Sequence, residues 1–125
     1  MLICIENSQG KQQYEALGFH IVVDMYDIDD KIDAIDAIET SVKVGRLTKI
    51  SSYYHFYDNI FSGVVLLAES HLSLHINYHL KRAYLDVYTC GEPQGAVDSA
   101  DFLLKALKPK KIYTKSPTKR AYENC

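Results

Sequence analysis

Two stretches near the middle of the chain alternate strictly between apolar and polar residues. Such alternation is typical of strands with one buried face, because successive side chains point to opposite sides of a sheet. The stretches cover residues 71–77 and 84–90. We expect an antiparallel hairpin across Tyr78 to Arg82, since a slip of one residue would mix the apolar and polar faces. The shared polar surface then carries His71, Ser73, His75, Asn77, Tyr84, Asp86, Tyr88 and Cys90.

A first amphipathic helix is predicted upstream of this hairpin. Its apolar residues recur at the helical spacing of three and four positions: Ile32, Ile35, Ile38 and Val42. The preceding Asp27, Asp29 and Asp30 offer carboxylates for the N-cap and the first turn. Acidic residues on the exposed face of a surface helix are far commoner than a metal site. We therefore expect no metal.

A second helix is predicted downstream of the hairpin. Glycine and proline residues interrupt the pattern before it, at Gly91, Pro93 and Gly95. An apolar stripe follows, made of Val97, Ala100, Leu103, Leu104 and Leu107. The helix is expected to end at Pro109, because proline cannot continue the helical hydrogen bonding.

Runs rich in β-branched and aromatic residues predict three more strands, at 18–25, 47–57 and 62–69, the last of them central. A turn is expected at Asp58-Asn59, and a short strand from Lys111 to Tyr113 closes the sheet. The order is strand, helix, several strands, helix, strand. It predicts an α/β (α+β) fold, a two-layer sandwich in which a mainly antiparallel sheet carries both helices on one face.

The 125 residues are enough for one domain, and no repeat, low-complexity block or long linker divides them. We therefore expect a single domain, 1–125. A chain this short buries a limited share of its surface. A deep active site would then borrow walls from a second subunit, which favours a homodimer.

Charge and hydropathy limit the possible partners. The net charge of −2 gives no general attraction to nucleic acid, and we expect the basic residues from Lys108 to Arg120 to be solvated. The longest apolar run, Val64 to Ala68, is too short to span a membrane, so a cytoplasmic protein without membrane partners is expected. The three widely spaced cysteines argue against a disulfide framework or a four-ligand zinc site.

Ser70 follows a long apolar strand and precedes an alternating one, a place suited to a strained turn. A serine hydroxyl can attack the carbonyl of the preceding residue and convert the amide to an ester. β-Elimination then splits the chain and leaves dehydroalanine, which hydrolyses to a pyruvoyl ketone. The reaction needs local strain, a polarised carbonyl and a base, and His75 lies on the polar face nearby. Ser62 stands at the opposite end of the preceding strand.

This region resembles the self-cleavage segment of the bacterial S-adenosylmethionine decarboxylases. The family pattern is Ser-Gly before an apolar strand, then Glu-Ser-His, a second histidine four residues later, and Thr-Cys-Gly. The matching residues here are Ser62-Gly63, Glu69-Ser70-His71, His75 and Thr89-Cys90-Gly91. His20 matches an early family histidine, and the resemblance covers roughly residues 18–113.

The resemblance implies cleavage between Glu69 and Ser70, into a β chain of residues 1–69 and an α chain of residues 70–125. It implies that Ser70 becomes the pyruvoyl group that forms a Schiff base with the substrate amine, with no other cofactor. Ser62 and His75 would act in processing, and Cys90 would be the proton donor. A homodimer of cleaved protomers would decarboxylate a small amino-acid-type substrate, S-adenosylmethionine by default, in polyamine (spermidine) biosynthesis.

The sequence departs from the family after the second histidine. Most members continue with Thr-Trp-Pro-Glu, whereas this chain has residues 76–79, Ile-Asn-Tyr-His. A carboxylate accepts two hydrogen bonds from a ribose diol, and His79 cannot do the same. Phe56 or Tyr57 could stack on an adenine. The alternatives are decarboxylation of ornithine or arginine, with the cationic tail held by Asp86, Glu69 or another free carboxylate, or a catalytically silent partner of a true decarboxylase.

Overall fold

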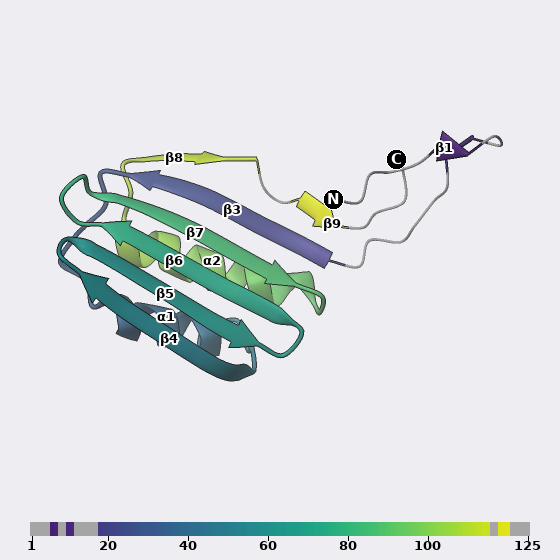
Figure 1. The fold of residues 1–125 in the computed structure, drawn as a ribbon, viewed down its shortest axis with the longest axis horizontal. Helices are drawn as coiled ribbons and strands as arrows, with labels where there is room; N and C mark the ends of the chain where they lie inside the picture. The colour runs from purple at the N-terminus through teal and green to yellow at the C-terminus, as the bar shows by residue number, and fades with distance from the viewer. Residues whose placement is uncertain (1–5, 8–9, 12–17, 116–117, 121–125) are drawn as a thin grey trace.

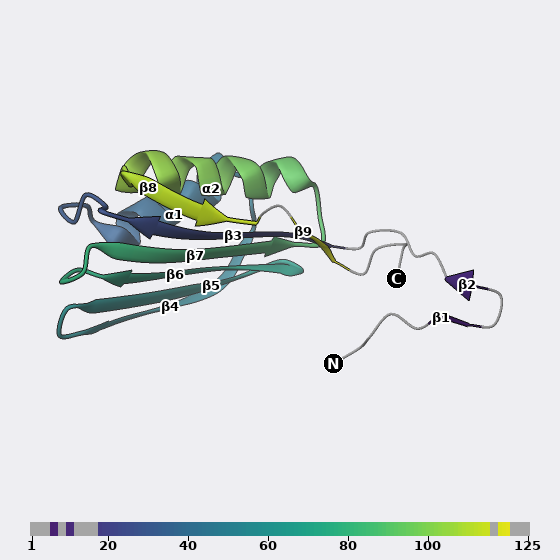
Figure 2. The same ribbon diagram turned by 90° about the horizontal axis from the view of Figure 1, so that it is seen from above.

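One antiparallel sheet carries two helices on a single face. The computed structural model describes residues 6–7, 10–11, 18–115 and 118–120. The helices are α1 (Ala34–Val44) and α2 (Pro93–Leu107). The sheet contains β3 (Gly18–Tyr26), β4 (Lys49–Tyr57), β5 (Ile60–Leu67), β6 (Ser70–Asn77), β7 (Arg82–Thr89), β8 (Lys111–Thr114) and β9 (Thr118–Arg120). A separate two-stranded ladder joins β1 (Glu6–Asn7) to β2 (Gly10–Lys11). Figures 1 and 2 show both helices on the same side of the sheet, so the predicted two-layer sandwich is confirmed.

The strand order is β4-β5-β6-β7-β3-β8, and β9 also pairs with β3. The predicted hairpin is β6 and β7, with His71 opposite Tyr88 and Ser73 opposite Asp86. Its polar residues lie on the face away from the helices, which we call the open face. The strand expected to be central is β5, which lies one place in from the β4 edge.

The core fills the space between the helices and the other face of the sheet. The strands β6 and β7 contribute the apolar residues of their alternating pattern to this core. From the helices it takes Ile38 and Val42 of α1 and Leu103 and Leu107 of α2. Val97, expected in the apolar stripe of α2, is instead 38% exposed. Within the described residues, no helix is long and apolar enough to cross a membrane.

The first helix begins later than the sequence predicts. Its N-cap is Asp33, whose carboxylate accepts a hydrogen bond from the backbone N–H of Asp36 at 3.0 Å. Asp29 instead accepts from the backbone N–H of Lys31 within the preceding turn, at 3.0 Å. Asp27 has a positive φ of 54°, which is incompatible with a right-handed helix. The chain therefore turns through the early aspartates before the helix starts.

The second helix begins earlier than predicted, with Pro93 in its first turn. Proline suits that position because its missing N–H would have no helical partner there. Gly95 therefore lies inside the helix. A Cβ at Gly95 would lie 2.6 Å from the carbonyl oxygen of Gly45, which follows α1. Glycine permits this close approach between the two helices.

The basic residues of the C-terminal region that the structure describes with side chains are exposed, as expected: Lys108, Lys110, Lys111 and Lys115. Cys90 is an exposed free thiol. Cys4 and Cys125 lie outside the described residues.

Candidate active site

The turn between β5 and β6 holds Ala68 and Glu69, and Leu67 pairs directly with Ser70 on either side of it. Glu69 has a φ of 60°. This left-handed conformation costs a residue other than glycine about 1–3 kcal/mol. The strained turn expected at this position is therefore present, and the peptide bond from Glu69 to Ser70 lies within it.

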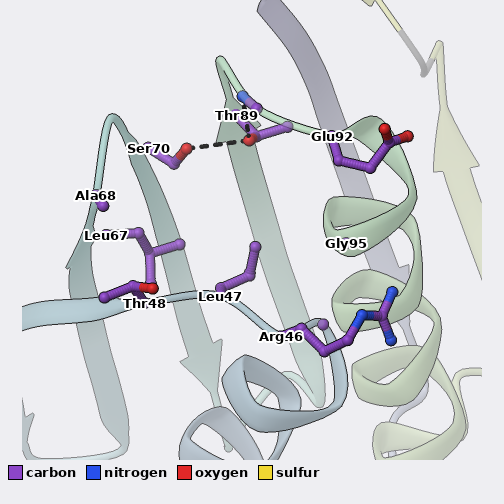
Figure 3. A pocket seen from close by; sticks show the side chains of 11 residues that line it. Arg46, Leu47, Thr48, Leu67, Ala68, Ser70, Thr89, Glu92 and Gly95 are labelled. Carbon is purple, nitrogen blue, oxygen red and sulfur yellow. Dashed lines mark hydrogen bonds between the residues drawn. The ribbon is translucent and has the colours of Figure 1, made fainter.

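The Ser70 side chain is buried on the helix side of the sheet, with 8% of its surface exposed. Its hydroxyl donates a hydrogen bond to Oγ1 of Thr89, at 3.0 Å (Figure 3). The same Thr89 oxygen accepts from the backbone N–H of Gly91, at 2.9 Å. Thr89 thus fixes the direction of the Ser70 hydroxyl. No motif in the sequence points to this contact; the signal that predicts it is the β6–β7 register, which places Ser70 opposite Thr89.

A cavity of about 240 Å³ opens beside Ser70. Its walls are the segment 45–48 after α1, the β5–β6 turn and the first residues of α2, as Figure 3 shows. Ser70 and Thr89 both line it, so the bond that would be cut borders a solvent-accessible space rather than the packed core.

Ser62 and His75 form a hydrogen-bonded pair on the open face. Nδ1 of His75 lies 2.9 Å from Oγ of Ser62, and the two residues are direct partners in the β5–β6 ladder. His75 is five residues along β6 from Ser70, which corresponds to roughly 16 Å of extended strand. The Ser70 side chain also points to the other face. One protomer therefore brings Ser62 to His75 but brings neither of them to Ser70.

Cys90 follows Thr89, so it is close to Ser70 in the sheet but belongs to the open face. Its Sγ lies 3.2 Å from the hydroxyl oxygen of Tyr88. The Tyr88 ring stacks on His71, with ring centroids 5.6 Å apart. Tyr88, which belongs to none of the family motifs, thus holds the thiol in place.

Phe56 and Tyr57 lie at the far end of the sheet from Ser70. Phe56 connects through Phe61 to Ile76 of β6, six residues or roughly 20 Å along the strand from Ser70. Its ring packs against Phe61, at 4.9 Å between centroids, on the helix side. Tyr57 points to the open face and is 68% exposed. Of the three residues expected to bind substrate, only Glu69 lies beside Ser70 in the same protomer.

Asp86 is not the free carboxylate that the ornithine or arginine alternative invokes. Its Oδ1 pairs with Nε2 of His20, and its Oδ2 lies 3.3 Å from Nε2 of His71. A cationic substrate tail would have to displace both imidazoles. The early histidine of the family pattern is therefore joined to the Glu-Ser-His segment through Asp86.

Comparison with known proteins gives one consistent result. A family model described as S-adenosylmethionine decarboxylase matches residues 19–120. The S-adenosylmethionine decarboxylase proenzyme of Thermoplasma volcanium is 47% identical over 105 residues, which cover 79% of this chain and 81% of that protein. The proenzyme of Aquifex aeolicus is 47% identical over 104 residues, 78% of this chain and 77% of that protein.

A solved structure agrees with these matches. The crystal structure of the adenosylmethionine decarboxylase from Aquifex aeolicus superposes with a TM-score of 0.81 at 38% sequence identity. The match covers 86% of this chain and 93% of that one. The similarity therefore extends over the whole sheet and both helices.

Proposed function

Because the chain belongs to the S-adenosylmethionine decarboxylase family, we propose that it is a proenzyme that cuts itself between Glu69 and Ser70 and then decarboxylates S-adenosylmethionine. The products of cleavage are a β chain, 1–69, and an α chain, 70–125. The observation that carries the proposal is the left-handed φ of 60° at Glu69, next to a buried serine hydroxyl. Strain at that residue is released when the peptide bond rearranges.

Cleavage begins when Oγ of Ser70 attacks the carbonyl carbon of Glu69. The new C–O bond replaces the C–N bond, and the freed nitrogen takes up a proton. Loss of the Cα proton of Ser70 then breaks its Cβ–O bond and leaves Glu69 with a free carboxylate. Water finally replaces the nitrogen, which departs as ammonia. Thr89 supports the first step because it holds the hydroxyl in one direction.

The residues near position 70 are suited to the pyruvoyl group that cleavage would produce there. A pyruvoyl group at position 70 would supply a ketone that reacts with the substrate amine and accepts electrons during decarboxylation. The carbon left behind must then take up a proton. Cys90 comes one residue after Thr89, the partner of Ser70, and its exposed thiol lies on the open face. The thiol serves as that donor if the new chain end, released by cleavage, turns from the helix side toward the open face. The hydroxyl of Tyr88 orients the thiol.

We further propose that the Ser62–His75 pair acts in processing from a second copy of the chain. The pair is too far from Ser70 to act within one protomer. A homodimer stacked through the open face would instead bring the pair of one copy to the exposed Glu69 of the other, at the peptide bond that is cut, although the Ser70 side chain itself lies on the helix side. Exposed apolar residues lie on that face at Val22, Val64, Leu66 and Tyr84. Tyr57 is on the same face, two positions along β4 from His55, the partner of Ser62. Tyr57 of the second copy would then enter the active site and stack on the adenine of S-adenosylmethionine.

Mass spectrometry and a substrate assay test the enzyme proposal. The purified chain is expected to give a fragment that begins at position 70 and lacks an amino group. It should release carbon dioxide from S-adenosylmethionine and not from arginine or ornithine, since Asp86 is already occupied. The product would then serve polyamine (spermidine) biosynthesis. A Ser70→Ala variant should stay intact, and Cys90→Ala should cut normally but turn over slowly. A wild-type chain that never cuts would instead support the silent partner.

Co-expression tests whether processing crosses between copies. Ser70→Ala and His75→Ala chains are each expected to stay uncut when expressed alone. In a mixed dimer the His75→Ala chain keeps its own Ser70 and meets the intact His75 of its companion. It should therefore be cut, and only that chain should be. Mixed dimers in which both chains remain whole would show that His75 acts within its own protomer or not at all.

A further inference from the structure

Three potential metal ligands meet on the open face of the sheet, and they come from three adjacent strands. His20 belongs to β3, Asp86 to β7 and His71 to β6. One ring nitrogen from each histidine and one carboxylate oxygen all lie within 4.8 Å of one another. We propose that these three residues bind one divalent transition-metal ion of the zinc class. The aspartates before α1 and the three cysteines, considered alone, lead to the expectation of no metal anywhere in the chain, and the proposed site departs from that expectation.

The ligands are held in place by contacts outside the cluster. Tyr88 lies beside both imidazoles: it stacks on His71 at an interplanar angle of 27° and meets the edge of His20 at 89°. The two oxygens of Asp86 are directed to different imidazoles. Each Nε2 therefore already faces the carboxylate. An ion placed among them would take over contacts that the three side chains now make with one another.

The geometry suits tetrahedral coordination after small side-chain movements. Bonds of about 2.0–2.1 Å to nitrogen and oxygen place neighbouring ligand atoms about 3.3 Å apart. Closing the cluster from 4.8 Å to that separation needs shifts of about 1–1.5 Å, well within the reach of side-chain rotation. The side chains of His20, His71 and Asp86 are 20%, 43% and 34% exposed, so each has room to move. The fourth position would face outward from the sheet.

The ligand types select the class of ion. Two imidazoles and one carboxylate suit zinc, copper, nickel or iron, whereas magnesium and calcium prefer oxygen ligands throughout. The competing explanation is a hydrogen-bonded cluster in which Asp86 only orients two histidines. The two explanations differ in one measurable way, because only a metal site gives saturable binding that depends on both imidazoles.

Cobalt titration of the purified full-length chain, first treated with a chelator, tests the proposal. Tetrahedral Co²⁺ absorbs visible light strongly, so binding is observed directly and needs no enzyme activity. We expect one Co²⁺ per chain, displaced by Zn²⁺. Loss of a ligand should weaken binding by at least the 10–100-fold that is typical when a supporting residue of a metal site is removed. His71→Gln and Asp86→Asn are the test variants.

His55→Gln is the matched control. His55 is an exposed histidine on the same face, stacked on Tyr53 at the β4 edge, and its loss should leave Co²⁺ binding unchanged. Far-UV circular dichroism identifies any test variant that fails to fold, in which case His20→Gln replaces it. The proposal is wrong if the wild-type chain shows no saturable binding, or if His71→Gln binds as tightly as His55→Gln. It is also wrong if a sulfur-to-cobalt band disappears in Cys90→Ala, because the ion would then sit on the thiol.

Discussion

Replacing Glu69 by glycine should stabilise the uncut chain and slow its cleavage. Glu69 has a φ of 60°, a conformation that glycine adopts without steric cost. The strain removed is about 1–3 kcal/mol, and the extra freedom of glycine in the unfolded chain offsets about 0.5–1 kcal/mol of it. The net gain in folding free energy is therefore about 1 kcal/mol. If the rearrangement releases that strain, cleavage should slow about fivefold, because 1 kcal/mol corresponds to that factor in rate.

Stability is measured by urea unfolding in a Ser70→Ala background, so that cleavage does not interfere. The cleavage rate is measured by gel densitometry in the otherwise unaltered chain. Asp58→Gly is the control, because Asp58 has a φ of 49° in the corresponding two-residue turn at the other end of β5. It should give a similar stabilisation with no change in cleavage rate. Equal cleavage rates for Glu69→Gly and the unaltered chain would refute a role for backbone strain.

Three further outcomes are expected. Thr89→Val leaves the buried hydroxyl of Ser70 without its acceptor, which should cost about 1–3 kcal/mol of stability and slow cleavage, whereas Thr89→Ser should restore both. Gly95→Ala should destabilise the fold by about 1–3 kcal/mol in thermal unfolding, despite the helix preference for alanine, because the new Cβ meets the carbonyl of Gly45. Burial raises the pKa of Tyr54 to about 12, so its neutral form stabilises the fold. This contribution is complete below about pH 10 and declines as the pH rises towards 12, and in urea unfolding Tyr54→Phe should lack that decline.

The alternating pattern predicted the hairpin well because strand periodicity is a local property. It placed His71, His75 and Cys90 on one face, and the structure agrees. The same alternation also puts Ser70 with Leu72 on the opposite, buried face. The family motif groups Ser70 with His71 and His75 and does not indicate that their side chains point to different faces. Residues that lie close together in the sequence motif therefore do not all lie on one face of the sheet.

Other features depend on pairings that no local pattern specifies. The contact between His20 and Asp86 exists because β3 lies beside β7, two strands far apart in the sequence. The start of α1 was misplaced because Asp27, Asp29, Asp30 and Asp33 are all good N-cap residues. Only the path of the chain through the preceding turn selects Asp33.

The central claim is that the bond before Ser70 rearranges and leaves a ketone at the new chain end. Intact-mass measurement of the purified protein tests it most directly. The account predicts two polypeptides, the downstream one lighter by one ammonia than the same fragment with an intact serine. A single full-length mass that persists through prolonged incubation, or a downstream fragment that retains its amino group, would contradict it.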